Sequence, residues 1–161
     1  MNYTNKGATI SDCGKYRYNL TRTWAAGKAV MFIGLNPSTA NADEDDPTIR
    51  KCVNFADRWG YSSIVMTNLF AYRATDPKEM KKADDPVGPA NDLFLEEESF
   101  GADLIVCAWG ANGDYLQRDD SVVHLLKHQC GFDLKCLKLT KDGHPWHPLY
   151  VKYDTPLIEF K

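Results

Sequence analysis

The chain has 161 residues, of which 43% are hydrophobic and 25% are charged, with a net charge of −3 and a pI near 5.8. These values are typical of a globular chain with a real apolar core, and we expect residues 1–161 to form one α/β domain. The acidic balance argues against a general nucleic-acid-binding protein, which usually carries a basic surface. No signal peptide or membrane-spanning run is recognisable, so we expect a cytoplasmic protein that makes no membrane contact.

The five cysteines form no C-x-x-C pair, and their odd number argues against a disulfide framework. Cys52, Cys107 and Cys136 lie within apolar patterns. This placement favours buried free thiols over a metal-binding or redox role.

The N-terminal part is the hardest to assign. Residues 16–24 alternate loosely and are rich in strand formers, which predicts an antiparallel edge strand beside the next apolar run. That next run, 30–35, is typical of a fully buried strand. It stops at Asn36-Pro37, where proline cannot donate to a strand ladder and restricts the residue before it. We therefore expect the chain to turn there and Asn36 to point into a pocket.

An acidic loop at 43–46 follows and ends in Asp46-Pro47. Asp is a favoured N-cap and Pro a favoured first helical residue, which predicts a helix from Pro47 that Gly60 ends. The acidic residues could instead hold a metal ion, but helix capping combined with a solvated loop is the interpretation that we favour.

Three further apolar runs predict strands at 64–69, 104–109 and 134–139, the last of them half exposed. Helical patterns lie between them at 78–82, 89–100 and 114–129. Strands that alternate with helices predict parallel pairing with helices on both faces of the sheet. We thus expect a three-layer α/β sandwich around a four-stranded, mainly parallel sheet, with an additional antiparallel N-terminal edge strand.

Polar residues follow every predicted strand, at the edge where parallel sheets bind ligands. They are Asn36 and Ser38, then Asn68 and Arg73, then Trp109 with Asn112, and finally His144 and His147. Each has a structural alternative, such as a turn hydrogen bond for Asn36, a loop contact for Asn68, a surface ion pair for Arg73 or a core position for Trp109. The two histidines lack a third ligand at suitable spacing, so no metal site is predicted.

Several segments resemble the bacterial and phage family known as domain of unknown function 1643. They lie at 34–40, 45–50, 59–61, 67–77, 85–92, 108–110 and 143–150. The resemblance extends over most of the chain from about residue 16. It implies membership of a family but names no reaction.

A more distant resemblance concerns chemistry. The segment 34–38, Gly-Leu-Asn-Pro-Ser, is similar to the first motif of the mismatch-specific branch of the uracil-DNA glycosylase superfamily, in which the Asn positions the attacking water. Asn68, followed by Arg73, resembles that superfamily's second-strand segment, in which an Asn reads the base edge. His147-Pro148 or His144-Pro145 resembles the final motif, whose His stabilises the departing base. The superfamily fold is a four-stranded parallel sheet with helices on both faces.

The resulting hypothesis is a glycosylase-like hydrolase that cleaves the N-glycosidic bond of a base in a nucleotide or in DNA that is single-stranded or has the base flipped out. Asn36 would position water, Asn68 would read the base, and His147 or His144 would stabilise the leaving base. The remaining binding residues would be Ser38, Arg73, and Phe70 or Trp109 as a stacking surface.

No metal or organic cofactor is required by this hypothesis. Two alternatives stay open, a non-catalytic module that binds a nucleotide or modified base, and a phage-related protein-interaction domain. The sequence predicts neither the protein partners nor the oligomeric state.

Overall fold

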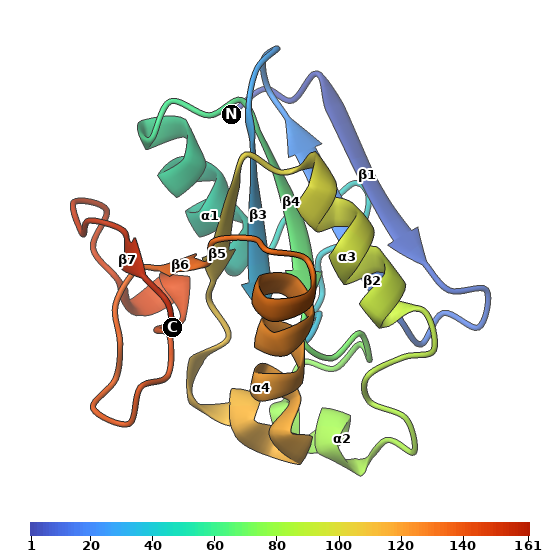
Figure 1. The fold of residues 1–161 in the computed structure, drawn as a ribbon. Coiled ribbons are helices and arrows are strands. Elements are labelled where there is room, and N and C mark those ends of the chain that lie inside the picture. The colour runs from blue at the N-terminus through green and yellow to red at the C-terminus, as the bar shows by residue number, and fades with distance from the viewer.

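A mixed sheet of seven strands runs through the computed structural model, which describes residues 1–161 (Figure 1). The strand order is β1-β2-β4-β3-β5-β6-β7. The strands β4, β3, β5 and β6 are mutually parallel, whereas β1, β2 and β7 join antiparallel. Their bounds are β1 Asn5–Ile10, β2 Arg17–Thr23, β3 Ala29–Gly34, β4 Ser63–Asn68, β5 Leu104–Cys107, β6 Lys135–Cys136 and β7 Ile158–Glu159.

The predicted α/β class is confirmed, but the sheet is larger and less parallel than the sequence indicated. Three of its six neighbouring strand pairs are antiparallel. The N-terminal strand was also expected in the wrong place, because β2 pairs with β4 rather than with β3. The strand β1 pairs with the other side of β2. Both sides of β3 are occupied by parallel partners, so the free side of β4 is the position left for β2.

Helices cover both faces of the sheet. On one face lies α1 (Pro47–Arg58), and on the other lie α3 (Asn91–Gly101), α4 (Arg118–Val123) and the π-helical turn η2 (His124–Gln129), with α3 and α4 in front in Figure 1. Alternate residues of β3 enter opposite cores, Phe32 with α1 and Ile33 with the other helices. This two-sided burial explains why the 30–35 segment is apolar throughout.

The helix predicted after the acidic loop is confirmed. The Asp46 side chain accepts a hydrogen bond of 2.9 Å from the Ile49 amide, and Pro47 begins α1. The acidic loop itself is not simply solvated, because Asp45 forms an ion pair of 2.7 Å with the fully buried Arg22 and accepts a hydrogen bond from the Tyr3 hydroxyl.

Two predicted elements are shorter than expected, the helix at 114–129 by its first four residues and the strand at 134–139 by four of its six residues. The helix expected at 114–129 begins only with α4, because the preceding segment η1 (Gly110–Gln117) is 3-10 and ends with positive φ values at Leu116 and Gln117. The strand expected at 134–139 shrinks to β6, because the chain then turns back on itself, with Leu139 opposite Pro145. This turn delivers the 144–150 segment to the end of the sheet.

The two remaining helical segments are short. They are α2 (Pro77–Lys82), where a helical turn was predicted, and the 3-10 turn η3 (Pro148–Tyr150). None of the helices combines the length and the apolar character needed to cross a membrane.

Candidate functional site

A cavity of about 390 Å³ lies at the carboxyl ends of β3, β4 and β5. Six of the residues singled out in the sequence line it, namely Asn36, Ser38, Asn68, Trp109, Asn112 and His147. Other polar or aromatic lining residues, not assigned to the site from sequence, are Arg17, Asp46, Thr48, Thr75 and Tyr150. The cavity thus collects side chains from segments far apart in the chain, as the parallel central strands predict.

Three predicted site residues lie outside the cavity. Phe70 is fully buried in the core against Tyr115, with ring centroids 5.8 Å apart. Arg73 reaches toward the N-terminal hairpin and donates to the Gly14 carbonyl at 3.3 Å. His144 sits in the turn before η3, where its backbone amide donates to the Thr140 hydroxyl. Their positions after the strands are as expected, but the loops direct them elsewhere.

The Asn36 side chain is held in a single orientation. Its Nδ2 donates to the Ala74 carbonyl at 2.8 Å and to the Pro37 carbonyl at 3.2 Å. Since both partners accept, the amide nitrogen must face them, and Oδ1 remains as an acceptor. The residue therefore joins two loops and also supplies an oriented oxygen among the cavity residues.

Asn68 ends β4 and is 3% exposed. Its Nδ2 has no hydrogen-bond partner within the protein. A buried amide donor without a partner costs about 1–3 kcal/mol of stability, so such atoms are uncommon in folded proteins. Asn68 thus offers an unused donor in the wall of the cavity.

Arg17, at the start of β2, is the lining residue that sequence reasoning missed most clearly. It is 2% exposed, and among its guanidinium nitrogens only Nη1 is bonded, to the Ala40 carbonyl at 2.8 Å. Burial lowers the Arg17 pKa to about 10, while the nearby Asp46 carboxylate opposes this shift. The sequence predicted this strand at an exposed edge of the sheet, where an arginine is an ordinary solvated residue and suggests no functional role.

His147 precedes the 3-10 turn η3 and caps it. Its Nδ1 accepts a hydrogen bond of 3.2 Å from the Leu149 amide, which assigns the proton of the neutral ring to Nε2. Burial lowers the His147 pKa below its ordinary value, and Asp46 again acts in the opposite direction. The imidazole is therefore favoured as a neutral group that donates through Nε2.

The aromatic residues divide between the core and the rim. Trp109 is 2% exposed and packs edge-to-face on Phe160, with Gly113 crowded against its indole, so its ring faces are covered by protein. Tyr150 is 74% exposed, and its ring centroid lies 5.8 Å from that of His147. Tyr150 thus supplies the exposed aromatic surface at this cavity. The sequence feature that could have identified it is its position three residues after His147.

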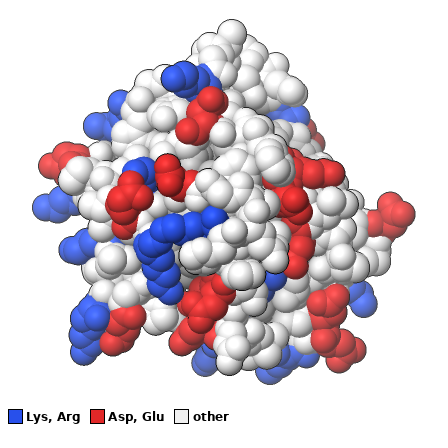
Figure 2. Space-filling view, in the orientation of Figure 1, with Lys and Arg blue, Asp and Glu red and all other residues white.

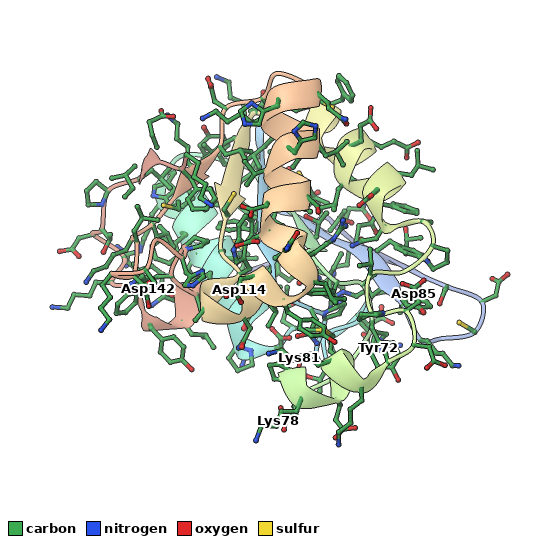
Figure 3. The ribbon with its side chains drawn as sticks, turned by 60° about the horizontal axis from the view of Figure 1, so that its bottom comes forward. Tyr72, Lys78, Lys81, Asp85, Asp114 and Asp142 are labelled. Carbon is green, nitrogen blue, oxygen red and sulfur yellow. The ribbon has the colours of Figure 1, made fainter.

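Charges of both signs surround this end of the molecule. Figure 3 brings it forward and shows Lys78 and Lys81 of α2 with Asp114 of η1 and the loop residues Asp85 and Asp142. The adjoining face in Figure 2 likewise mixes acidic and basic side chains. No three His, Cys, Asp or Glu residues are grouped so that they could hold a metal ion. The polar groups that line the cavity are therefore amides, hydroxyls, an imidazole, a guanidinium and the single carboxylate of Asp46.

Comparison with known proteins gives one match. No curated protein matches the chain, and no solved structure does. The family model described as "Protein of unknown function (DUF1643)" matches residues 17–149, which include every cavity residue named above except Tyr150. The chain therefore belongs to this family of proteins of unknown function.

Proposed function

We propose that the protein hydrolyses the N-glycosidic bond between a base and a sugar, in a nucleotide or in a DNA base held outside a duplex. The observation that carries this proposal is the convergence of Asn36, Asn68 and His147 on one cavity. The resemblance of their sequence segments to the uracil-DNA glycosylase superfamily supports it. The cavity volume of about 390 Å³ lies within the range of about 300–1,000 Å³ typical of small-molecule sites.

Each of the three residues has a role that suits its hydrogen bonding. The free acceptor Oδ1 of Asn36 would orient a water molecule toward the anomeric carbon of the sugar. The unused Nδ2 donor of Asn68 would bind an acceptor on the base edge. The Nε2–H of neutral His147 would donate to the base as it departs with the electron pair of the broken C–N bond.

The cavity also contains one carboxylate that would accept the proton of the attacking water. Asp46 is the only acidic residue in its lining, and one of its oxygens is occupied as the cap of α1. The second carboxylate oxygen would take the water proton as the new C–O bond forms. A carboxylate in this position would also stabilise positive charge that develops on the sugar.

The test is to follow base release. Nucleosides, nucleotides and single-stranded oligonucleotides with varied modified bases are incubated with the protein, and free base and abasic sites are measured. We expect release from at least one substrate, and a loss of ~10²–10³ in rate for Asn36→Ala and for His147→Ala. His144→Ala is the matched control, because His144 lies outside the cavity. Equal rates in all three variants would contradict the proposed roles.

A second candidate is a non-catalytic module that binds a nucleotide or modified base. This candidate is favoured because two cavity residues already have structural roles, which explain their presence without catalysis. Asn36 joins two loops and Asp46 caps α1. Saturable binding of a nucleotide without release of base or formation of an abasic site would select this candidate.

A further inference from the structure

Two buried arginines lie on β2, and their surroundings differ. Arg22 is fully buried and forms an ion pair of 2.7 Å with Asp45. Its other guanidinium nitrogens donate to backbone carbonyls of Gly7, Thr21, Asn41 and Glu44. The charge of Arg22 is thus neutralised within the protein, in a network that fastens the N-terminal hairpin to the acidic loop.

Arg17 has no such network. It forms no ion pair, donates from Nη1 to the Ala40 carbonyl, and leaves a buried Nε without a partner. The Asp46 carboxylate lies near enough to favour the charged form of Arg17 but forms no ion pair with it. Burying a guanidinium that is only partly neutralised is costly, and a ligand that supplies further negative charge in the cavity would offset this cost. Arg17 lines the cavity, whereas Arg22 does not.

The other unused donors of the cavity residues have the same character. Besides Arg17 Nε, the buried Nδ2 of Asn68 and the indole Nε1 of Trp109 lack hydrogen-bond partners. All three are donors, and all three belong to residues that line the same cavity. A ligand rich in acceptor oxygens would satisfy the donors of Arg17 and Asn68, whereas the indole nitrogen of Trp109 lies against Gly113 in the core.

We propose that Arg17 binds an anionic group of the ligand, either a phosphate or a carboxylate on the base. If the protein hydrolyses N-glycosidic bonds as proposed, its substrate is therefore a nucleotide or an acidic nucleoside, and not a neutral nucleoside. At the cavity end, Asp85, Asp114 and Asp142 lie among the same group of charged residues as Lys78 and Lys81, so the charge there is mixed and does not favour a long polyanion (Figure 3). Recognition of the negative charge thus takes place inside the cavity.

The test measures thermal melting and calorimetric binding with defined probes. These are inorganic phosphate, 2′-deoxyuridine and 2′-deoxyadenosine, their 5′-monophosphates, and 5-carboxy-2′-deoxyuridine. We expect at least one charged probe to bind the wild type at least tenfold more tightly than the matching neutral nucleoside. A preference for the monophosphates identifies a phosphate site, and a preference for the carboxy compound identifies a carboxylate on the base.

Variants then connect this preference to Arg17. Arg17→Met should reduce it to less than twofold, while Arg17→Lys should keep part of it because the charge remains. Arg58→Met is the control, since Arg58 stacks on Tyr153 at the end of α1 and does not line the cavity. Arg58→Met should bind as the wild type does.

Stability separates a binding role from a structural one. Arg22→Met should lower the melting temperature because it leaves Asp45 without its partner, whereas Arg17→Met should leave the melting temperature unchanged or raise it. The proposal is overturned if no charged probe is preferred, if Arg17→Met keeps the preference, or if both arginine variants destabilise the protein equally. Because these measurements do not involve base release, a tenfold preference without cleavage would retain the anion site and reject the hydrolase.

Discussion

The side chain of Asn68 occupies the space beside Gly34 on the neighbouring parallel strand. The Asn68 Oδ1 atom lies 2.7 Å from the position that a Cβ atom at residue 34 would take. Met66 Cε lies 2.9 Å from the same position. The absence of a side chain at Gly34 therefore lets the Asn68 amide lie across the end of β3 at the cavity.

Gly34→Ala should disturb this arrangement. The added methyl group meets the Asn68 amide at a distance that real side chains do not tolerate, so Asn68 must move. Overpacking of this kind commonly costs about 1–3 kcal/mol, and urea unfolding should show a loss of this size. Binding of a nucleotide at the proposed site should weaken as well. Gly101→Ala is the control, because nothing lies within 4 Å of that Cβ position, and a stability loss equal to that of Gly34→Ala would contradict the explanation.

Substitution of Asn36 should separate its two roles. Asn36→Ala removes the hydrogen bonds to the Ala74 and Pro37 carbonyls, with an expected cost of about 1–2 kcal/mol in the free energy of unfolding. Asn36→Asp should be worse at neutral pH, because it places a carboxylate oxygen against those two carbonyl oxygens. Part of the extra loss should disappear below about pH 4, where a carboxyl group becomes neutral. Chemical denaturation at pH 7 and at low pH checks this order, and an Asn36→Asp protein as stable as Asn36→Ala would refute it.

The half-buried His147 should make stability depend on pH. Its pKa in the folded protein is lowered, chiefly by burial, so the unfolded chain takes up a proton first as the pH falls. The stabilising contribution is therefore complete above the unfolded pKa of about 6.5 and is lost as the pH decreases through the folded pKa. Thermal melting between pH 8 and pH 5 should show this decline.

His147→Gln provides the comparison for that pH series. It removes the titrating ring, so the part of the decline below about pH 6.5 that belongs to this residue should be missing. A variant with the same slope as the wild type would show that other groups cause the pH dependence.

The cysteines should differ strongly in reactivity toward an alkylating agent. Cys13 is exposed, and a hydrogen bond with Ser11 is the main cause that lowers the Cys13 pKa, which favours the reactive thiolate. Cys52, Cys107 and Cys136 are buried free thiols, as predicted, and burial raises the Cys136 pKa to about 11. Iodoacetamide at pH 8 should label Cys13 first and these three only in denaturant, as mass spectrometry would show. Cys13→Ser should remove the fast phase, and rapid native labelling of Cys136 would contradict the buried assignment.

The central part of the fold was predictable because its residues follow simple patterns. The strand β3 is apolar throughout, and Asp46-Pro47 marks the start of α1 with two independent signals. By contrast, β1 has the sequence Asn-Lys-Gly-Ala-Thr-Ile and is largely exposed, so no apolar period identifies it. Its place is fixed by hairpin pairing with β2, the next strand along the chain, and not by an apolar pattern of its own.

The candidate site, like the fold, was predictable only where residues follow the central strands. Asn36, Asn68 and His147 could be chosen because they follow strands or their connecting turns, where ligands of parallel sheets bind. Arg17 was missed because its role depends on the pairing of β2 with β4. This pairing brings Arg17 to the same cavity as Asn68, the last residue of β4. Arg73 was misplaced because the direction of its side chain is set by a contact with the Gly14 carbonyl, far away in the sequence.

The cavity joins the two ends of the chain, since Arg17 and His147 are separated by 130 positions in the sequence, from 17 to 147, yet line the same space. Contacts over such distances form slowly, because a long loop must close before they contribute. The complete site should therefore arise late in folding, after the central strands have paired. A bound nucleotide would then leave the refolding rate unchanged and would slow unfolding, which stopped-flow dilution into denaturant with and without the ligand can measure.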